Sequence, residues 1–484
     1  MANLLTQRWT DTGNADRLIA QCGPNLRHVG PWGWMAWHGS RWKRDTRGTI
    51  VEAAKATVAT FREQATQSAA VGLALPKSHD DHQQALALLR FVNVCESAAK
   101  IKAMVDLARS DPVVAADVAD FDAKPYLLNT KTQTIDLSSG IARAPDRNDL
   151  LTTGADVDPE EAPFHATAWE SFLREIMPNA DTRAYLQRAI GCSLIGEQRD
   201  HVIFLAYGTG RNGKGTLFRA IGRAIGAYYA PIPSDMLMEK PYPTHAAQLA
   251  DLMGKRLVVA NEVPRGKKLD EGKVKELSGG DRIKAQFMRE NWFDFTPTHT
   301  LWICANDRPR VTGTDAGIWR RMRVVPFLQA ISKESEDVDL DRKLAADAKY
   351  ILQWCIDGAL AYLRNGLGTC NEVDTATGEY RAEQDLMGLA LSEVCDMGTA
   401  LSCKKTELRT ALEVWIDEVG LHHVLSDRAL KTDFARRGIL DARPDRLGAW
   451  VWCGIALKPE WAARATQTPQ QQYRRTYHDN QTEE

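Results

Sequence analysis

Apolar and polar positions in the first third of the chain predict short strands followed by helices. Glycine and proline interrupt aromatic runs before residue 43, which predicts short strands with Trp32, Trp34 and Trp37 in a sheet core. Helical periodicity follows at 51–69 and 82–108. We therefore expect an α+β N-terminal domain.

A change of composition predicts where this domain ends. A hairpin pattern at 126–137 is followed by residues 142–163, which are rich in proline, aspartate and glutamate and show little periodicity. Such composition is typical of a linker. We expect the N-terminal domain to span residues 1–165.

Short apolar runs separated by helical patterns fill the middle of the chain. Runs typical of buried strands occur at 201–207, 256–260 and 301–305, after a helical stretch at 166–195. This alternation predicts an α/β domain over residues 166–335.

The C-terminal third shows weaker but readable patterns. Helical periodicity at 336–385 predicts a helical lid or linker, and residues 386–465 read as two helices and a strand pair, which suggests a winged-helix-like domain. The polar residues 466–484 predict a flexible tail.

A glycine-rich loop lies between the strand pattern at 201–207 and a helical pattern with one apolar face. This strand, glycine loop, lysine and helix form a P-loop pattern. Glycines let consecutive N–H groups turn toward phosphate oxygens, and the lysine reaches the β- and γ-phosphates. The expected nucleotide-binding residues are Gly208, Gly210, Asn212, Gly213, Lys214, Gly215 and Thr216. A glycine turn without a ligand is the competing interpretation.

One position departs from the strict pattern. Gly215 follows Lys214 directly, where serine or threonine usually holds Mg²⁺. Thr216 is the candidate substitute, so Thr216 and Glu262 are the expected metal residues.

Polar residues follow two further strand patterns. Glu262 comes after the run at 256–260, and Asn306 follows the run at 301–305. Ligands in open α/β sheets sit beyond the carboxyl ends of strands, so the P-loop, Glu262 and Asn306 are expected in one crevice. A carboxylate there can polarise a water molecule and an amide can orient it. Each residue alone is also compatible with an ordinary strand cap.

Two arginines follow the third strand pattern. Arg320 and Arg321 next to such a core are candidates for an arginine finger that stabilises charge on a transferring phosphate. A surface salt bridge is the alternative for either arginine.

A basic hairpin is predicted between Glu262 and Asn306. Apolar and polar residues alternate at 283–287 and 293–295, and residues 251–330 hold 15 Lys and Arg against 10 Asp and Glu. Lys284, Arg289 and Trp292 could contact a phosphate backbone and stack on a base. A solvated charged hairpin is the other interpretation.

Whole-chain composition adds limits to this picture. The net charge is −2, so the basic character is local, and nine scattered cysteines without a paired framework are typical of a reducing cytoplasm. No apolar stretch approaches the roughly 20 residues that span a bilayer. We expect a cytoplasmic protein of a bacterial or phage-infected cell, with no membrane partner.

Five segments, GTGRNGKGT, KRLVVANE, KVKELSGGDRIKAQF, LWICANDRPRV and GIWRRMRVVPF, together resemble the superfamily 3 helicases, specifically the phage and plasmid primase-helicase family. The region before them, with its RHV, GW and RW elements, resembles the poxviral-type N-terminal domain that accompanies helicases of this group. The resemblance implies an AAA+ P-loop ATPase core that uses ATP and Mg²⁺ and forms a ring, usually a hexamer. Its partner would be single-stranded or forked DNA, with a separate primase or polymerase as a further candidate.

The resemblance also implies a role for each matching residue. Lys214 would be the Walker A lysine, Glu262 the Walker B glutamate and Asn306 the sensor, while Arg320 or Arg321 would reach the ATP of a neighbour. Asn261 and Gln286 depart from this pattern, because many relatives carry an acid and an arginine there.

The sequence therefore predicts an ATP-dependent replicative DNA helicase of a phage, plasmid or integrated mobile element. Two alternatives from other classes stay open. One is an ATP-binding origin or DNA-binding platform that does not unwind, and the other is a nucleotide kinase, because GKGT also occurs there.

Overall fold

The computed structural model describes most of the chain and divides it into two compact units. The described residues are 2–163, 167–242, 245–288, 291–311, 316–332, 336–419, 427–443 and 449–465. Unit 1 comprises Met1–Val311 and Gly317–Thr377, and unit 2 comprises Thr312–Ala316 and Gly378–Glu484.

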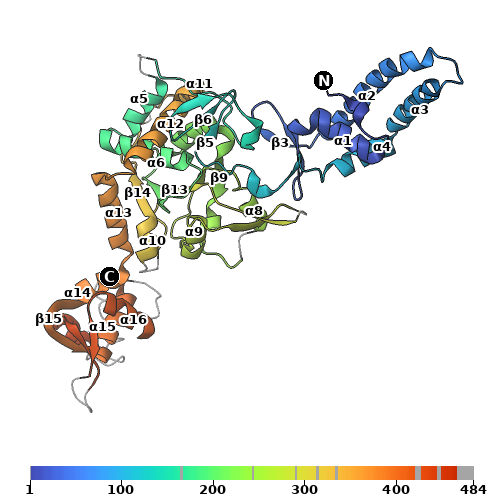
Figure 1. The fold of residues 1–484 in the computed structure, drawn as a ribbon. Coiled ribbons are helices and arrows are strands. Elements are labelled where there is room, and N and C mark those ends of the chain that lie inside the picture. Colours follow the sequence, from blue (N-terminus) through green and yellow to red (C-terminus); the bar gives the residue numbers. More distant parts are fainter. Residues whose placement is uncertain are drawn as a thin grey trace, which may run out of the picture. The chain divides into compact units, whose positions relative to one another are not determined.

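Unit 1 begins with a small sheet and a group of helices, which Figure 1 shows in blue. The sheet has the order β3-β2-β1-β4, and its centre is the antiparallel pair β1 and β2. The aromatic strands predicted before residue 43 are present, whereas the single helix predicted at 82–108 is two helices that break at Ser97. The elements are α1 (Asp11–Cys22), β1 (Leu26–Val29), β2 (Gly33–Trp37), β3 (Trp42–Arg44), α2 (Thr49–Leu73), α3 (Asp80–Cys95), α4 (Ala98–Ala108) and β4 (Ala115–Ala116).

The next segment packs directly on the central domain. A three-stranded antiparallel sheet is formed by β5 (Leu127–Asn129), β6 (Thr134–Asp136) and β7 (Ile141–Arg143). The buried side chains of Leu128 and Ala155 belong to the same apolar core as the central sheet.

The linker predicted at 142–163 therefore differs from the structure. The backbone of Ala227 donates a hydrogen bond to the carbonyl of Gly154 (3.2 Å), and the Tyr228 hydroxyl accepts one from the backbone of Asn129 (2.9 Å). These partners are distant in sequence, which is why composition alone indicates a linker. The domain limit at 165 stays a prediction, because residues 164–166 lie outside the described ranges.

The core of unit 1 is a five-stranded parallel sheet with the order β14-β8-β13-β10-β9 (Figure 1). Its strands are β8 (Ile203–Tyr207), β9 (Tyr229–Pro233), β10 (Leu257–Asn261), β13 (Thr300–Ala305) and β14 (Met322–Pro326). The mixed α/β character and the parallel sheet agree with the predicted fold class. Buried, almost wholly apolar strands are expected where helices cover a parallel sheet.

Helices surround this sheet. In α6 and α12 the glycines Gly191 and Gly358 meet so closely that a Cβ on Gly191 would lie 2.0 Å from the carbonyl carbon of Gly358. The helices of unit 1 beyond residue 166 are α5 (Ala168–Ile176), α6 (Ala180–Leu194), α7 (Lys214–Ile225), α8 (Ala246–Ala250), α9 (Glu271–Leu277), α10 (Ala316–Arg321), α11 (Leu340–Ala346) and α12 (Ala348–Asn365), with α13 (Asn371–Gln384) continuing into unit 2.

A two-stranded hairpin projects between β10 and β13 in sequence. It consists of β11 (Ile283–Gln286) and β12 (Trp292–Phe295), paired antiparallel with Lys284 opposite Asp294. Phe287 stacks on Phe293 at a centroid distance of 5.1 Å and packs against the aromatic cluster of the N-terminal sheet. One end of the hairpin is thus anchored by apolar contacts.

Unit 2 has its own apolar core and a three-stranded sheet with the order β15-β17-β16. The two helices and strand pair predicted here are present, together with a further strand, β15. The elements are α14 (Leu386–Val394), β15 (Cys395–Lys404), α15 (Lys405–Glu418), α16 (Asp427–Arg436), β16 (Leu440–Ala442), β17 (Val451–Leu457) and α17 (Pro459–Ala465). The predicted tail at 466–484 lies outside the described residues.

All nine cysteines are free. Among the helices in the described ranges, none combines the length and the apolar character that crossing a bilayer requires.

Candidate functional site

The predicted P-loop connects the carboxyl end of β8 to the amino end of α7. Gly213, with φ of 76°, precedes Lys214, which is the first residue of α7. A side chain at Gly213 would place its Cβ 2.5 Å from a methyl carbon of Ile176. Gly213 is therefore required both for the backbone turn and for close packing on α5.

Lys214 lies at the centre of this loop with its side chain turned inward. The residue is only 6 % exposed. Its Nζ donates hydrogen bonds to the carbonyl of Gly208 (2.7 Å), to Oδ1 of Asn212 (2.8 Å) and to Oδ1 of Asn306 (3.1 Å). The structure thus brings three predicted site residues, Gly208, Asn212 and Asn306, into contact with the ammonium group of Lys214.

The charge of this ammonium is not balanced by its hydrogen-bond partners. All three acceptors are neutral oxygens, and burial lowers the pKa of Lys214 below its ordinary value. A buried cation without an anionic partner is unfavourable, so the site suits an anionic group.

The loop also leaves room for such a group. A Cβ at Gly210 or Gly215 would meet no heavy atom of the described residues within 4 Å. Gly210, Arg211 and Gly213 have positive φ values of 102°, 48° and 76°, and left-handed residues within such a loop can direct N–H groups into an anion-binding hollow. The residues present therefore fit the phosphate groups of a nucleotide.

Asn306 and Glu262 lie at the same edge of the sheet but at different distances from the lysine. Asn306 follows β13, which pairs with β8, and it contacts Lys214 directly. Glu262 follows β10, one strand further away, and its side chain is exposed. Its φ of 58° is a left-handed conformation that is uncommon for glutamate, and its carbonyl accepts a hydrogen bond from the Ser234 hydroxyl (3.1 Å).

The predicted metal residues do not form a preassembled carboxylate cluster. Thr216 lies in the first turn of α7, and its hydroxyl accepts a hydrogen bond from Arg219 (3.3 Å). No group of three or more His, Cys, Asp or Glu residues suited to a metal occurs within the described ranges. Mg²⁺ commonly uses one or two protein ligands together with water and phosphate oxygens, so a site for it beside a bound nucleotide does not require such a cluster.

The two predicted finger arginines lie at the opposite edge of the sheet. They end α10 immediately before β14, whose first residue, Met322, pairs with Ile203 at the start of β8. The five residues of β8 span about 16 Å and separate this edge from Lys214. Arg320 is exposed, whereas Arg321 is partly buried and hydrogen-bonded to neighbouring carbonyls.

The hairpin brings together two of its three predicted DNA-binding residues. The Nζ of Lys284 lies 5.4 Å from the ring centroid of Trp292, and the Trp292 residue is 53 % exposed. Arg289 lies outside the described residues. A cation beside an exposed indole can contact a phosphate and a base at adjacent positions.

Sequence reasoning missed two features near these residues. Asn212 is predicted as a loop residue, yet its 3 % exposed side chain also donates to the carbonyl of Phe327 (3.2 Å) and so ties the loop to the end of β14. The contacts of Arg321 with Ser278 and His201 were also missed. The only sequence signal for the contact between Asn212 and Phe327 is the polar side chain of Asn212 directly before Gly213. No sequence pattern indicates the contacts of Arg321.

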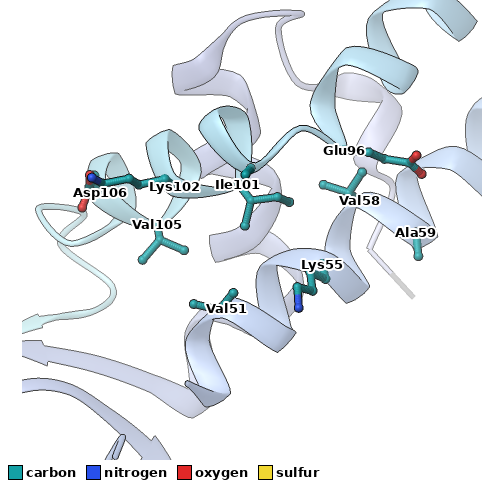
Figure 2. Close-up of a pocket in the computed structure, with 10 residues that line it drawn as sticks. Val51, Lys55, Val58, Ala59, Glu96, Ile101, Lys102, Val105 and Asp106 are labelled. Atoms are coloured by element: carbon teal, nitrogen blue, oxygen red, sulfur yellow. The ribbon is translucent and has the colours of Figure 1, made fainter. Parts of the chain in front are cut away.

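A separate hollow of about 560 Å³ lies among the N-terminal helices. In Figure 2 the side chain of Val51 from α2 lies across the hollow from those of Ile101 and Val105 from α4. Its lining is largely aliphatic and includes no glycine, so it lacks the features of a phosphate-binding loop.

Two families match separate parts of the chain. Residues 15–178 match the family described as "D5 N terminal like", and residues 206–321 match a family of unknown function (DUF5906). Each match covers less than half of the chain. The second match contains the P-loop, Glu262, Asn306 and the two arginines.

Several curated viral proteins are similar to this chain. "Putative helicase L207/L206" of Acanthamoeba polyphaga mimivirus is 29% identical over 224 residues, which cover 45% of this chain and 23% of that protein. "Putative helicase 022R" of Frog virus 3 is 26% identical over 200 residues, covering 40% of this chain and 20% of that protein.

"Putative primase C962R" of African swine fever virus is 24% identical over 158 residues, covering 31% of this chain and 16% of that protein. The chain thus matches less than a quarter of the length of each of these relatives. Together with the D5-type match, they make the chain similar to D5-like primase-helicases.

Among solved structures, the apo structure of the NrS-1 C terminal region aligns with a TM-score of 0.42 and 13% identity, covering 70% of this chain and 77% of that one. A TM-score below 0.5 does not establish a shared fold.

Gly215 has open space beside it, so a larger side chain can be tested at this position. Replacing Gly215 with Ser adds a hydroxyl where the strict P-loop pattern places a Mg²⁺ ligand, without a steric clash. We expect Gly215→Ser to lower the Mg²⁺ concentration required for half-maximal ATP binding severalfold, measured by calorimetric titration.

Gly215→Ala is the matched control, because it fills the same space without a ligand oxygen. If the Ser and Ala variants require the same Mg²⁺ concentration, this position does not face the metal.

Proposed function

We propose that this chain is an ATP-dependent DNA translocase of the superfamily 3 helicase type. The observation that carries the proposal is the buried Lys214 ammonium, held by neutral oxygens at the carboxyl edge of a parallel sheet. An anionic triphosphate would supply the missing negative charge. The similarity to viral proteins named as helicases and a primase supports DNA replication as the setting.

Each residue at the carboxyl edge has a chemical role in this proposal. Lys214 would bind the β- and γ-phosphates, and the exposed carboxylate of Glu262 would accept a hydrogen bond from the attacking water. Asn306, already hydrogen-bonded to Lys214, would orient that water or respond to the γ-phosphate. Mg²⁺ held by Thr216 and Glu262 would neutralise charge on the phosphate oxygens.

The position of the arginines supports hydrolysis between subunits. Arg320 lies at the amino edge of the sheet, a strand length of about 16 Å from its own Lys214. It would therefore act on the nucleotide of a neighbouring copy, and a closed ring, expected to be a hexamer, would provide such a neighbour at every site. The exposed Arg320 suits the finger better than the hydrogen-bonded Arg321.

The hairpin would contact DNA within this assembly. Lys284 would pair with a backbone phosphate and Trp292 would stack on a base of a single strand or fork. In unit 2, the order β15-β17-β16 with α15 and α16 suits a winged helix. Arg437, directly after α16, is paired with Asp385 (2.5 Å) and Asp433 (2.7 Å).

We place this activity in the cytoplasm, where a phage, plasmid or integrated element would be copied, with a primase or polymerase as a further partner. The expected domain plan keeps the AAA+ ATPase core at 166–335, the α+β domain at 1–165, the helical lid at 336–385 and the winged-helix-like domain at 386–465.

The central test measures ATP hydrolysis with and without single-stranded DNA. The wild type should be stimulated by DNA, and Arg320→Ala should lower the rate by a factor of about 10³ or more. Mixing Arg320→Ala with Lys214→Ala subunits should restore part of the rate, because some interfaces then combine an intact lysine with an intact arginine.

Each variant measured alone is the control for the mixture. If no mixture recovers activity, the arginine does not act between subunits. If the wild type hydrolyses no ATP with DNA present, the proposed function is wrong.

A second prediction concerns the hairpin. Lys284→Ala should reduce the slope of log Kd against log salt for single-stranded DNA by about one unit, because one phosphate contact is lost. Fluorescence anisotropy over a range of salt concentrations measures this slope.

Lys268→Ala is the control, since Lys268 is a lysine of the same domain that is paired with Glu239 at 2.7 Å. An unchanged slope for Lys284→Ala would show that Lys284 of the hairpin does not contact a DNA phosphate.

A further inference from the structure

Arg321 connects two segments that are far apart in sequence. Its Nη1 donates to the carbonyl of Ser278 (2.8 Å), to the hydroxyl of Ser278 (3.3 Å) and to the carbonyl of His201 (3.4 Å). His201 lies just before β8, and Ser278 is the capping residue directly after α9. The guanidinium therefore joins the end of α10 to the end of α9 beside the amino edge of the sheet.

The carbonyl of Ser278 is held in place by burial and by hydrogen bonds from two side chains. Ser278 is 2 % exposed, and Nδ1 of His201 also donates to its carbonyl (3.2 Å). The preceding carbonyl, of Leu277, accepts a hydrogen bond from the side chain of Gln198 (2.7 Å). Three side chains thus hold the end of α9, and Arg321 is the one that comes from the helix carrying Arg320.

A short segment leads from Ser278 to the hairpin, and it begins with two glycines that the local backbone requires. Gly280 has φ of 81°, and a Cβ at Gly279 would lie 2.8 Å from the carbonyl oxygen of Lys275. Two residues after Gly280 the chain reaches Arg282, and β11 with Lys284 begins at Ile283. Only residues 279–282 lie between Ser278, whose carbonyl Arg321 contacts, and β11, the strand that carries Lys284.

The neighbouring arginine has a different environment. Arg320 is exposed, and its backbone carbonyl accepts a hydrogen bond from Arg323 (3.0 Å). Of the two adjacent arginines, Arg320 is therefore exposed to solvent, and Arg321 turns toward the protein and contacts Ser278.

We propose that Arg321 is a positioning residue that couples the nucleotide contact made by Arg320 to the position of the DNA hairpin. The inference rests on the proposed function. A shift of Arg320 toward or away from the phosphates of a neighbouring subunit moves the end of α10, and Arg321 passes this displacement to Ser278 and the hairpin. Nucleotide state and DNA affinity are then linked through this contact.

A purely structural role for Arg321 makes a different prediction. Loss of a structural contact would weaken DNA binding equally in every nucleotide state. Loss of a coupling contact would remove the difference between states, because the hairpin would no longer respond to Arg320.

The experiment measures the Kd of the full-length chain for a fluorescein-labelled oligothymidylate by anisotropy, once with ADP and once with a non-hydrolysable ATP analogue. The wild-type ratio of the two Kd values should be about fivefold or more. Arg321→Ala should bring the ratio to within about twofold of unity. Arg321→Lys should restore part of it, because one donor to the Ser278 carbonyl is retained.

Arg199→Ala is the matched control. Arg199 is an exposed arginine shortly before β8, so its loss removes one positive charge near the same edge without touching Ser278. This variant should keep the wild-type ratio.

If Arg321→Ala folds poorly, Arg321→Lys and hydrogen exchange in the wild type provide the test. Exchange at 279–286 should differ between the ADP and ATP-analogue states of the wild type, and this difference should shrink in Arg321→Lys.

One outcome would contradict only the coupling role of Arg321, and another would also contradict the proposed function. If the wild type shows the ratio and Arg321→Ala or Arg321→Lys keeps it in full, the coupling role is wrong while the proposed function stands. If the wild type shows no difference between nucleotide states and no ATP hydrolysis, the proposed function fails and the coupling role fails with it.

Discussion

The chemistry of the candidate site depends on one buried ammonium group. Lys214 is held by the carbonyl of Gly208 and the amide oxygens of Asn212 and Asn306, none of which carries a negative charge. Burial lowers the pKa of this lysine, so its positive charge carries an electrostatic cost that a bound anion relieves. The contact with Asn306 connects the loop to the end of β13, so an anion that attracts Lys214 also changes the environment of Asn306.

The parallel sheet separates the functional groups into two sets. The loop, Asn306 and Glu262 follow the carboxyl ends of strands, whereas Arg320 and Arg321 precede β14 at the amino edge. Because parallel strands point the same way, groups at opposite edges of one sheet cannot share one ligand. A second copy of the chain removes this constraint, which is the physical reason to expect an assembly of subunits.

Local sequence patterns predicted the strands that are buried along almost their whole length. The strands β8, β10 and β13 are nearly continuous apolar runs, and the structure places each within about two residues of the pattern. β9 escaped prediction because Pro231 and Pro233 interrupt its pattern, which an edge strand tolerates.

Features that depend on distant partners were not predictable. The segment at 142–163 has a linker composition, yet Leu151 and Ala155 are buried, because their neighbours come from elsewhere in the sequence. For the site, sequence identified the loop lysine and the polar residues after β10 and β13. It could not distinguish Arg320 from Arg321, because only the fold determines which arginine meets the carbonyl of Ser278.

The most direct test of this account is the affinity for ATP with Mg²⁺ of the wild type, of Lys214→Met and of Lys255→Met, measured by isothermal titration calorimetry. Lys255 is a second lysine whose pKa burial lowers and whose Nζ donates to a carbonyl, that of Ala227 at 2.9 Å, but it lies away from the loop. We expect Lys214→Met to weaken binding by a factor of about 10 or more, since a charge-assisted contact is lost, and Lys255→Met to bind as the wild type does. Equal affinities for the wild type and Lys214→Met would contradict the account.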